Sequence, residues 1–359
     1  MHFRKPAPYI SSMSSNERAI GLAKIAENAQ VAVSTVSRAL RNSPEIHPKT
    51  RKRILREAQA LGYETGGRAR GKNPANPAQI LVLTAGEEPP RGYMTGLSQA
   101  SIEQNVTLNF HSCPATDAAN LLQPDKIPVA LKQGLAAGAI LIYRWPTEIA
   151  EQVARQLPTV SLVHTYPDVP ADTIGIQESG GIALLVDHLR KLGHKRIGFF
   201  GLCPDLSWSR ARYGAYVDAL IGSNLPIIPE ATFRIALRKD NGTLFPVDFS
   251  TNIDAIVKQV RSGVSAWIVP DEGVAYALEV ALIEQGLRIP EDVSVVGFHR
   301  HPRPAINAPL VTSVAVNVEE MTRLAIKRIL SRQEEPDQEH LTLLVRCKFA
   351  PGESTGPCR

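Results

Sequence analysis

Short apolar runs that alternate with amphipathic segments constrain the fold of this chain more than any other feature. Runs such as ILVLTA (80–85), AILIY (139–143) and VSVVGF (293–298) have the length and β-branched content of buried strands. Between them, segments such as 180–193 and 274–286 have the apolar spacing of helices. Strands that alternate with helices form parallel sheets covered on both faces. The sequence therefore predicts an α/β fold built on parallel sheets.

This alternating region, residues 79–359, is too long for one comfortable doubly wound domain, so we expect two lobes. We assign about 79–174 and 301–330 to the first lobe, and about 175–300 and 331–350 to the second. Ligands of parallel sheets bind at the carboxyl ends of the strands. Two such lobes predict a ligand site in the cleft between them.

The N-terminal part has a different pattern. Residues 1–17 are polar and rich in serine, and we expect them to be disordered. Residues 18–63 have a helical period and predict a small all-α bundle of three helices, with a helix-turn-helix formed by 22–29 and 32–41. The third helix is expected to start near His47-Pro48 and to end at Gly62. Its predicted apolar stripe consists of Ile54, Leu55, Ala58 and Leu61.

Positive charge is concentrated at the same end of the chain. Residues 1–78 carry fourteen Lys and Arg and five Asp and Glu, a net charge of +9, whereas the remainder carries −4. This asymmetry favours a domain that binds a polyanion, although a solvated basic surface is the alternative. Residues 64–78 add glycine, proline and basic residues, which predicts a basic linker between the two parts.

The second helix of the bundle has the residue types of a DNA-recognition helix. One face of this helix carries Ser34, Ser37, Arg38 and Arg41, while Val36 and Leu40 point toward the bundle. A helix-turn-helix lays this helix in the major groove, where hydroxyls suit phosphates and arginine pairs with guanine. The alternative is a solvated face of an ordinary bundle.

Other features restrict the function classes. The four cysteines form no CxxC pair, and no signal peptide or long apolar span is present, so we expect a cytoplasmic protein that does not contact membranes. The motifs GxSxG, GxGxxG after a strand and the P-loop are absent, so no enzyme and no cofactor are predicted. The HRH triplet at 299–301 lacks a third ligand nearby, so no metal site is predicted.

The segment 22–63 resembles the headpiece of the LacI/GalR family of bacterial transcription regulators. The matching residues include Thr35-Val36-Ser37-Arg38, Thr50-Arg51 and the closing Leu61-Gly62-Tyr63. The resemblance continues in order through DHLRKLGHKRIGFFG (187–201), SRARYGAYVDAL (209–220), EQGLRIPEDVSVVGF (284–298), APLVTSVAVNVEEM (308–321) and FAPGEST (349–355).

This resemblance implies a regulator, expected to be a repressor, that binds a pseudo-palindromic operator in double-stranded DNA as a homodimer. It implies that Val33 and Ser34 read bases, that Arg38 contacts a base edge, and that Thr35 and Ser37 contact phosphates. The remainder resembles two-lobed periplasmic sugar-binding proteins, which implies a small-molecule effector, expected to be a carbohydrate, between the lobes. The alternatives are a regulator with a non-sugar, protein or no effector, and, more remotely, a sugar transport protein.

The sequence departs from the family pattern at the turn and in the linker. The turn glycine is Gln30 and the helix-capping serine is Ala32. In place of the family's hinge-helix leucine, the linker carries lysine. We therefore predict that Arg68, Arg70 and Lys72 lie along phosphates or a narrow minor groove, with a flexible basic tether as the alternative.

The effector site also departs from the family pattern. Arg210 matches the family's sugar-binding arginine, Asp271 belongs to an Asp-Glu pair in place of Asn-Asp, and His299 replaces an aspartate. We predict that these three residues bind the effector. The alternatives are an internal Arg210–Asp271 ion pair and a loop histidine without a ligand.

Overall fold

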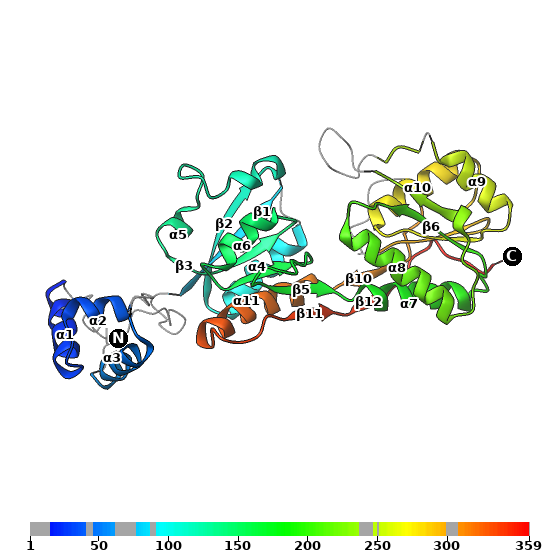
Figure 1. Cartoon of the computed structure of the whole chain (residues 1–359). Coiled ribbons are helices and arrows are strands. Elements are labelled where there is room, and N and C mark those ends of the chain that lie inside the picture. Colours follow the sequence, from blue (N-terminus) through cyan, green and yellow to red (C-terminus); the bar gives the residue numbers. More distant parts are fainter. Residues whose placement is uncertain are drawn as a thin grey trace, which may run out of the picture. The chain divides into compact units, whose positions relative to one another are not determined.

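The computed structural model describes residues 15–40, 46–61, 77–86, 91–236, 247–249, 251–298 and 308–358. The chain divides into two compact units, Met1–Pro77 and Ala78–Arg359, each with its own core (Figure 1). None of the helices in these ranges is long and apolar enough to cross a membrane.

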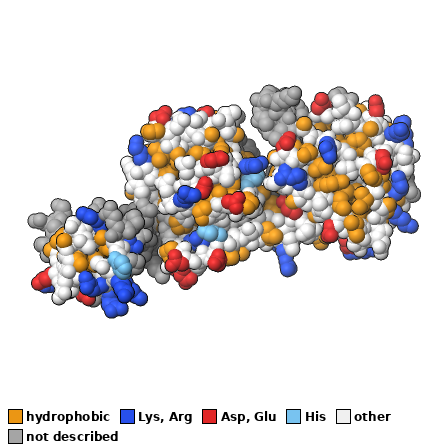
Figure 2. Space-filling model, viewed as in Figure 1, with side chains coloured by type: hydrophobic (Ala, Val, Ile, Leu, Met, Phe, Trp, Pro, Cys, Tyr) orange, Lys and Arg blue, Asp and Glu red, His pale blue; other side chains and the backbone are white. Residues whose placement is uncertain are grey.

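The first unit is a three-helix bundle, here called the headpiece. Its helices are α1 (Ser15–Asn28), α2 (Val33–Leu40) and α3 (Pro48–Ala60). Lys and Arg side chains gather on one side of it (Figure 2). The core is small and consists mainly of alanine and β-branched residues: Ile25, Ala26, Ala29, Val36, Ala39, Ile54 and Ala58. The three-helix prediction is confirmed.

Two details of the headpiece prediction are wrong. Helix α1 begins at Ser15, so residues 15–17 are helical, whereas residues 1–14 lie outside the described part. In the predicted stripe, Ile54 and Ala58 are buried, Leu61 is exposed just after the end of α3, and Leu55 is exposed on α3 itself. The reason is that a helical turn of 3.6 residues keeps positions 54 and 58 in line and rotates position 55 by about 100°.

The turn between α1 and α2 takes the conformation that glycine favours, although its residue is Gln30. Gln30 has a φ of 49°. Its N–H donates to Glu27 O at 3.1 Å, and Val31 N–H donates to Ala26 O at 3.0 Å. These two bonds form a Schellman motif with Gln30 as the left-handed residue after the helix. A side chain at this position has a steric cost that glycine lacks.

We expect Gln30→Gly to stabilise the headpiece by about 1 kcal/mol, because glycine removes the strain of the left-handed conformation. The measurement is thermal unfolding of the full chain, followed at the headpiece transition. Ala23→Gly, on the exposed side of α1, is the matched control and should lower stability by about 1 kcal/mol. Equal destabilisation by both glycines would show that the turn is not strained.

The first lobe of the second unit is a six-stranded parallel sheet. Its order is β11 (Thr342–Val345), β5 (Asp172–Ile176), β4 (Thr159–Leu162), β3 (Ala136–Ile142), β1 (Ala78–Ala85) and β2 (Val106–Cys113). One face packs on α4 (Arg91–Glu103) and α11 (Val318–Glu334). The other face packs on η1 (Ala115–Asn120), α5 (Val129–Lys132) and α6 (Thr147–Ala154). Strand β1 shows the alternation, since Ile80 and Val82 join the first layer, and Leu81 and Leu83 the second.

The second lobe has a four-stranded parallel sheet in the order β7 (Thr232–Arg234), β6 (Ile197–Leu202), β8 (Ala266–Ile268) and β9 (Ser294–Val296). Helices α7 (Glu178–Lys191) and α8 (Ser207–Gly222) pack on one face. Helices α9 (Ile253–Arg261) and α10 (Glu272–Glu284) pack on the other, and η2 (Pro229–Ala231) precedes β7. A separate antiparallel pair is formed by β10 (Ser313–Val316) and β12 (Cys347–Ala350). The predicted α/β fold with parallel sheets is confirmed.

The predicted lobe boundaries need correction near the C-terminus. Residues 331–350 were assigned to the second lobe, but the end of α11 and all of β11 belong to the first, where β11 pairs with β5. Conversely, Thr312 bridges to Val296 of β9, so the start of the segment 308–330 lies with the second lobe. Because both lobes have the same strand-helix pattern, only the hydrogen bonding of β11 assigns it.

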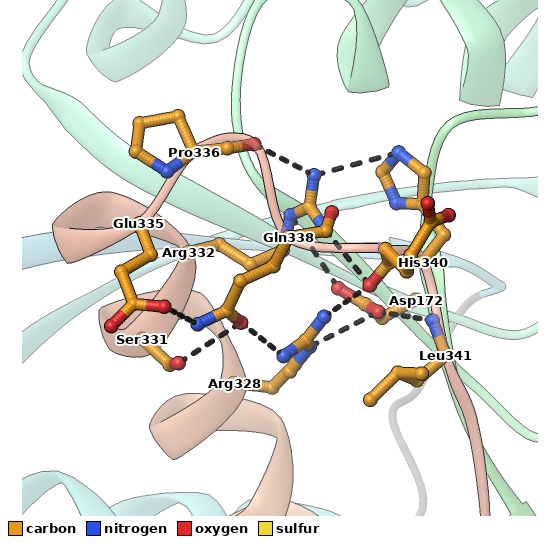
Figure 3. Close-up of polar contacts among 10 residues, drawn as sticks. Asp172, Arg328, Ser331, Arg332, Glu335, Pro336, Gln338, His340 and Leu341 are labelled. Atoms are coloured by element: carbon orange, nitrogen blue, oxygen red, sulfur yellow. Dashed lines mark hydrogen bonds and ion pairs between the residues drawn. The ribbon is translucent and has the colours of Figure 1, made fainter.

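A buried charge network holds β11 in this place (Figure 3). Asp172, the first residue of β5, is 1% exposed, and its Oδ1 accepts the N–H of Leu341 at 2.6 Å. The same carboxylate lies 3.1 Å from Arg328 Nε and 3.6 Å from Arg332 Nε. Arg332 also donates to Gln338 O at 2.8 Å, and Arg328 donates to Glu339 O at 2.6 Å. Both carbonyls lie in the connection to β11. The network therefore ties α11, β5 and the β11 connection together.

Candidate functional site

Helix α2 has two contrasting faces. Val36 and Ala39 are buried between α1 and α3. Val33 is 45% exposed, and Ser34 and Arg38 are also exposed. Thr35 and Ser37 are half-buried. The residues predicted to read bases therefore lie on the outward side of a helix that Val36 anchors to the bundle.

The N-terminus of α2 has no capping side chain, because Ala32 occupies the N-cap position. Its carbonyl accepts the N–H groups of Thr35 at 2.9 Å and Val36 at 3.1 Å. The N–H groups of the first turn therefore find no side-chain acceptor at position 32, and such groups at a helix N-terminus attract anions. The other predicted DNA contacts, Arg41, Arg68, Arg70 and Lys72, lie outside the described residues.

In the second lobe, the carboxyl ends of the strands surround Arg212, which is 4% exposed. Its Nε donates to Glu178 Oε2 at 2.7 Å, its Nη2 donates to Glu178 Oε1 at 3.3 Å, and its Nη1 donates to the carbonyl of Pro270 at 2.5 Å. The guanidinium lies 3.8 Å from the ring centroid of Phe298 and 4.8 Å from that of Trp208. Polar donors beside aromatic rings are typical of sites that bind ring-shaped polar ligands.

The structure places the predicted effector residues differently. Arg210 is exposed and donates to the carbonyl of Pro204 at 2.5 Å. Asp271 caps α10 by accepting the N–H of Val274 at 3.1 Å, and no Arg210–Asp271 ion pair occurs among the described residues. His299 lies outside the described residues. Arg212 is the residue that the sequence analysis missed.

Helical spacing could have identified Arg212. The buried Ser209 precedes Arg212 by three residues, and the buried Tyr216 follows it by four. All three side chains therefore share the inner face of α8. Arg210 is two residues away, and that offset turns it to the opposite side of the helix.

The first lobe contributes a second group of residues at its strand ends. Tyr143 follows β3, and its ring would lie 3.1 Å from a Cβ atom added to Gly86, after β1. The hydroxyl of Tyr93 on α4 is buried, and that burial raises its pKa above the ordinary value, while Arg212, Tyr143 and Glu178 all act on it electrostatically. Tyr93 of the first lobe therefore lies close enough to Arg212 and Glu178 of the second lobe for their charges to affect its pKa.

The backbone at these strand ends is strained. Tyr143 has a φ of 63° and Val163, after β4, has a φ of 72°. A left-handed conformation is unusual for any side chain and especially for a β-branched one. Such strain concentrates at functional sites, where the surrounding structure holds it in place.

His164 follows the strained Val163, and its burial together with the charge of Arg144 lowers its pKa from 6.5 to about 4. Between pH 6.5 and pH 4 the folded chain binds fewer protons at His164 than the unfolded chain, so stability falls as the pH falls through this window. We expect this histidine to lower the free energy of unfolding by about 2 kcal/mol between pH 7.5 and pH 5. Denaturant unfolding of the wild type and His164→Gln at both pH values measures it, and an unchanged pH dependence in the variant would contradict it.

Two family models match the chain. The model described as "Bacterial regulatory proteins, lacI family" matches residues 22–65, and the periplasmic binding protein-like domain matches residues 186–355. The chain belongs to the lacI family. It is a DNA-binding transcriptional regulator, in which the first match covers α2 and the second covers Arg212, Trp208 and Phe298 but not Glu178.

Three curated relatives of this lacI-family regulator are named as repressors. The ribose operon repressor of Haemophilus influenzae is 24% identical over 326 residues, which covers 89% of this chain and 94% of the relative. The repressor CytR of Escherichia coli K12 is 24% identical over 342 residues, and the match covers 94% of this chain and 97% of CytR. The repressor MelR of Bacillus subtilis is 25% identical, and the match covers 86% of this chain and 90% of MelR.

Solved structures share the fold of this lacI-family chain. The lac repressor dimer bound to operator and the anti-inducer ONPF aligns with a TM-score of 0.60 at 19% identity, covering 92% of this chain and 98% of that one. The CelR–cellobiose complex aligns with a TM-score of 0.60 at 20% identity, covering 93% and 99%. A ribose-bound regulator from Enterococcus faecium aligns with a TM-score of 0.57 at 19% identity, covering 78% and 100%.

Proposed function

We propose that this regulator acts in the cytoplasm as a homodimeric repressor of a pseudo-palindromic operator, and that a carbohydrate or a carbohydrate derivative bound at the Arg212 site controls it. The observation that carries the proposal is the pairing of two features in one chain. An outward recognition helix is held by a small core, and a buried arginine lies among aromatic rings at the strand ends of a two-lobed domain.

The DNA contacts follow from the faces of α2. Val33, Ser34 and Arg38 face outward and would meet base edges, with Arg38 able to donate two hydrogen bonds to a guanine. Thr35 and Ser37 would meet phosphates beside the uncapped N-terminus of the helix. The basic residues Arg41, Arg68, Arg70 and Lys72 would add contacts with phosphates or the minor groove.

The effector would act by favouring one arrangement of the lobes. The sugar-bound relatives CelR and the Enterococcus faecium regulator support a carbohydrate class. The half-buried ring of Trp208 offers an apolar face to a sugar ring, and the carboxylate of Glu178 can accept hydrogen bonds from hydroxyls, while the buried Arg212 and Phe298 hold Glu178 and Trp208 in place. A ligand that binds one arrangement more tightly shifts the population and thereby operator affinity.

Selection of bound sites from random DNA, with and without a panel of sugars, tests the proposal. We expect a symmetric site whose affinity changes with one ligand. Arg38→Ala should weaken binding to that site by about 10- to 100-fold, as expected for loss of one base-reading arginine. The control Arg155→Ala, at an exposed position directly after α6 of the first lobe, should bind normally. A selected pool without symmetry would contradict the dimer, and a site indifferent to every ligand would favour a regulator without a sugar effector.

A further inference from the structure

Helix α3 of the headpiece concentrates positive charge on one face. Its 13 residues include five Lys and Arg against one acidic residue, Glu57, so its net charge is 5 − 1 = +4. Four of these cations are exposed and are spaced by three or four residues, so they share one face of the helix: Lys49, Lys52, Arg53 and Arg56. We call them the basic stripe. They contribute to the Lys and Arg side chains that gather on the headpiece (Figure 2).

The basic stripe points away from the core that α3 shares with α2. Ile54 and Ala58 are the α3 residues in that core, and Val36 and Ala39 are the α2 residues. At about 100° per residue, the stripe positions lie about 160° to 260° around the helix axis from Ile54. The stripe is therefore on the side of α3 opposite to α2. A straight DNA duplex that lies on the outward face of α2 would leave the basic stripe uncovered.

The basic stripe has an electrostatic cost in the free headpiece. Lys49 and Arg53 are like charges four residues apart, and so are Lys52 and Arg56, and such pairs destabilise a helix. Lys49 also lies in the first turn of α3, where the backbone N–H groups carry partial positive charge and no acidic residue offsets it. The core that carries this cost has only seven buried residues. A bound polyanion would relieve the repulsion.

Duplex DNA has the charge density that this stripe requires. A helix rises about 1.5 Å per residue, so the stripe is about 10 Å long from Lys49 to Arg56. Duplex DNA carries one negative charge per about 1.7 Å of its axis, so a segment of that length presents about six phosphates. Long basic side chains contact phosphates without reading the bases. Because α2 holds the headpiece on an operator, other segments of the same DNA molecule are present at a raised local concentration.

We propose that the basic stripe is a second DNA-binding surface, which holds the phosphates of a DNA segment other than the operator and has no sequence preference. This rests on the proposed function, because the operator contact of α2 brings the second segment near. A regulator bound to its operator would thereby bridge two segments of DNA.

Binding of two duplexes by the full-length chain tests the inference. The operator duplex from the site selection carries one dye and is present in excess, and a non-operator duplex of equal length carries another dye. We expect a sedimenting complex that contains both dyes at low salt. The logarithm of the affinity for the second duplex should fall with the logarithm of the salt concentration with a slope of about −3, because about four phosphates are neutralised.

The test variant combines four substitutions, Lys49→Gln, Lys52→Gln, Arg53→Gln and Arg56→Gln. It should bind the second duplex about 10-fold or more weakly, while its affinity for the operator changes by less than about 3-fold. Glutamine favours helices and removes the like-charge pairs, so the headpiece should unfold at the same or a higher temperature. The matched control removes equal charge from exposed positions of the second unit by glutamine substitution at Lys132, Arg155, Lys191 and Arg346, and should leave both affinities unchanged.

The inference would be overturned if no complex contained both dyes, or if the test variant and the control weakened the second duplex equally. A test variant that lost operator affinity and flattened the salt dependence of operator binding would also overturn it, since the stripe would then lie on the operator itself. The operator dye reports separately on the proposed function. Absence of that dye from the complex contradicts the regulator, whereas its presence without the second dye contradicts only the second surface.

Discussion

Asp172→Asn is expected to lower the free energy of unfolding of the second unit by about 3 kcal/mol or more, because it removes the one carboxylate shared by two largely buried arginines. The substitution keeps the shape of the side chain but leaves the charges of Arg328 and Arg332 without compensation. Unfolding by urea at pH 7, followed by the fluorescence of the buried Trp145 and Trp267, measures the loss.

The matched control is Asp187→Asn on α7. Asp187 also lies between two cations, Arg190 and Lys191, but all three side chains are well exposed. Water screens such a pair, so the control should change stability by less than about 1 kcal/mol. Similar losses in the two variants would show that burial does not govern the Asp172 network.

Glu178→Gln is expected to destabilise the second lobe by about 3 kcal/mol, since it leaves the guanidinium of Arg212 buried without its carboxylate. Ligand binding at the site should weaken at the same time. Urea unfolding and calorimetric titration of the same variant measure the two effects.

A double-mutant cycle separates this ion pair from general damage to the lobe. Arg212→Met replaces the buried cation with an apolar chain that the rings of Phe298 and Trp208 can cover. The double variant Glu178→Gln/Arg212→Met should lose much less stability than the two single losses added together. Additive losses would mean that the two side chains act independently.

Much of the fold could be predicted from local pattern. The helices of the headpiece, the α/β class and the outward face of α2 all follow from the period of apolar residues, which depends on backbone geometry alone. The left-handed turn after α1 could also be anticipated, because Gln30 occupies the turn position at which the family carries glycine.

The effector site was predicted less well, for two physical reasons. Neighbouring basic residues such as Arg210 and Arg212 look equivalent in sequence, although one lies on the exposed side of α8 and the other on its buried side. Asp271 has the residue type of a ligand-binding group, but helix capping uses its carboxylate. Side-chain chemistry alone does not reveal which partner a group has found.

The amino-acid sequence by itself determined the types of element, their order, and the division into a basic headpiece and a larger α/β part, because these depend on interactions between residues close in the chain. Only the tertiary structure decided the lobe to which β11 belongs and the arginine that meets Glu178. These depend on contacts between residues far apart in sequence. Asp172 shows this most clearly, since its partners follow it by more than 150 residues, and they are needed to hold a charge that water would otherwise stabilise.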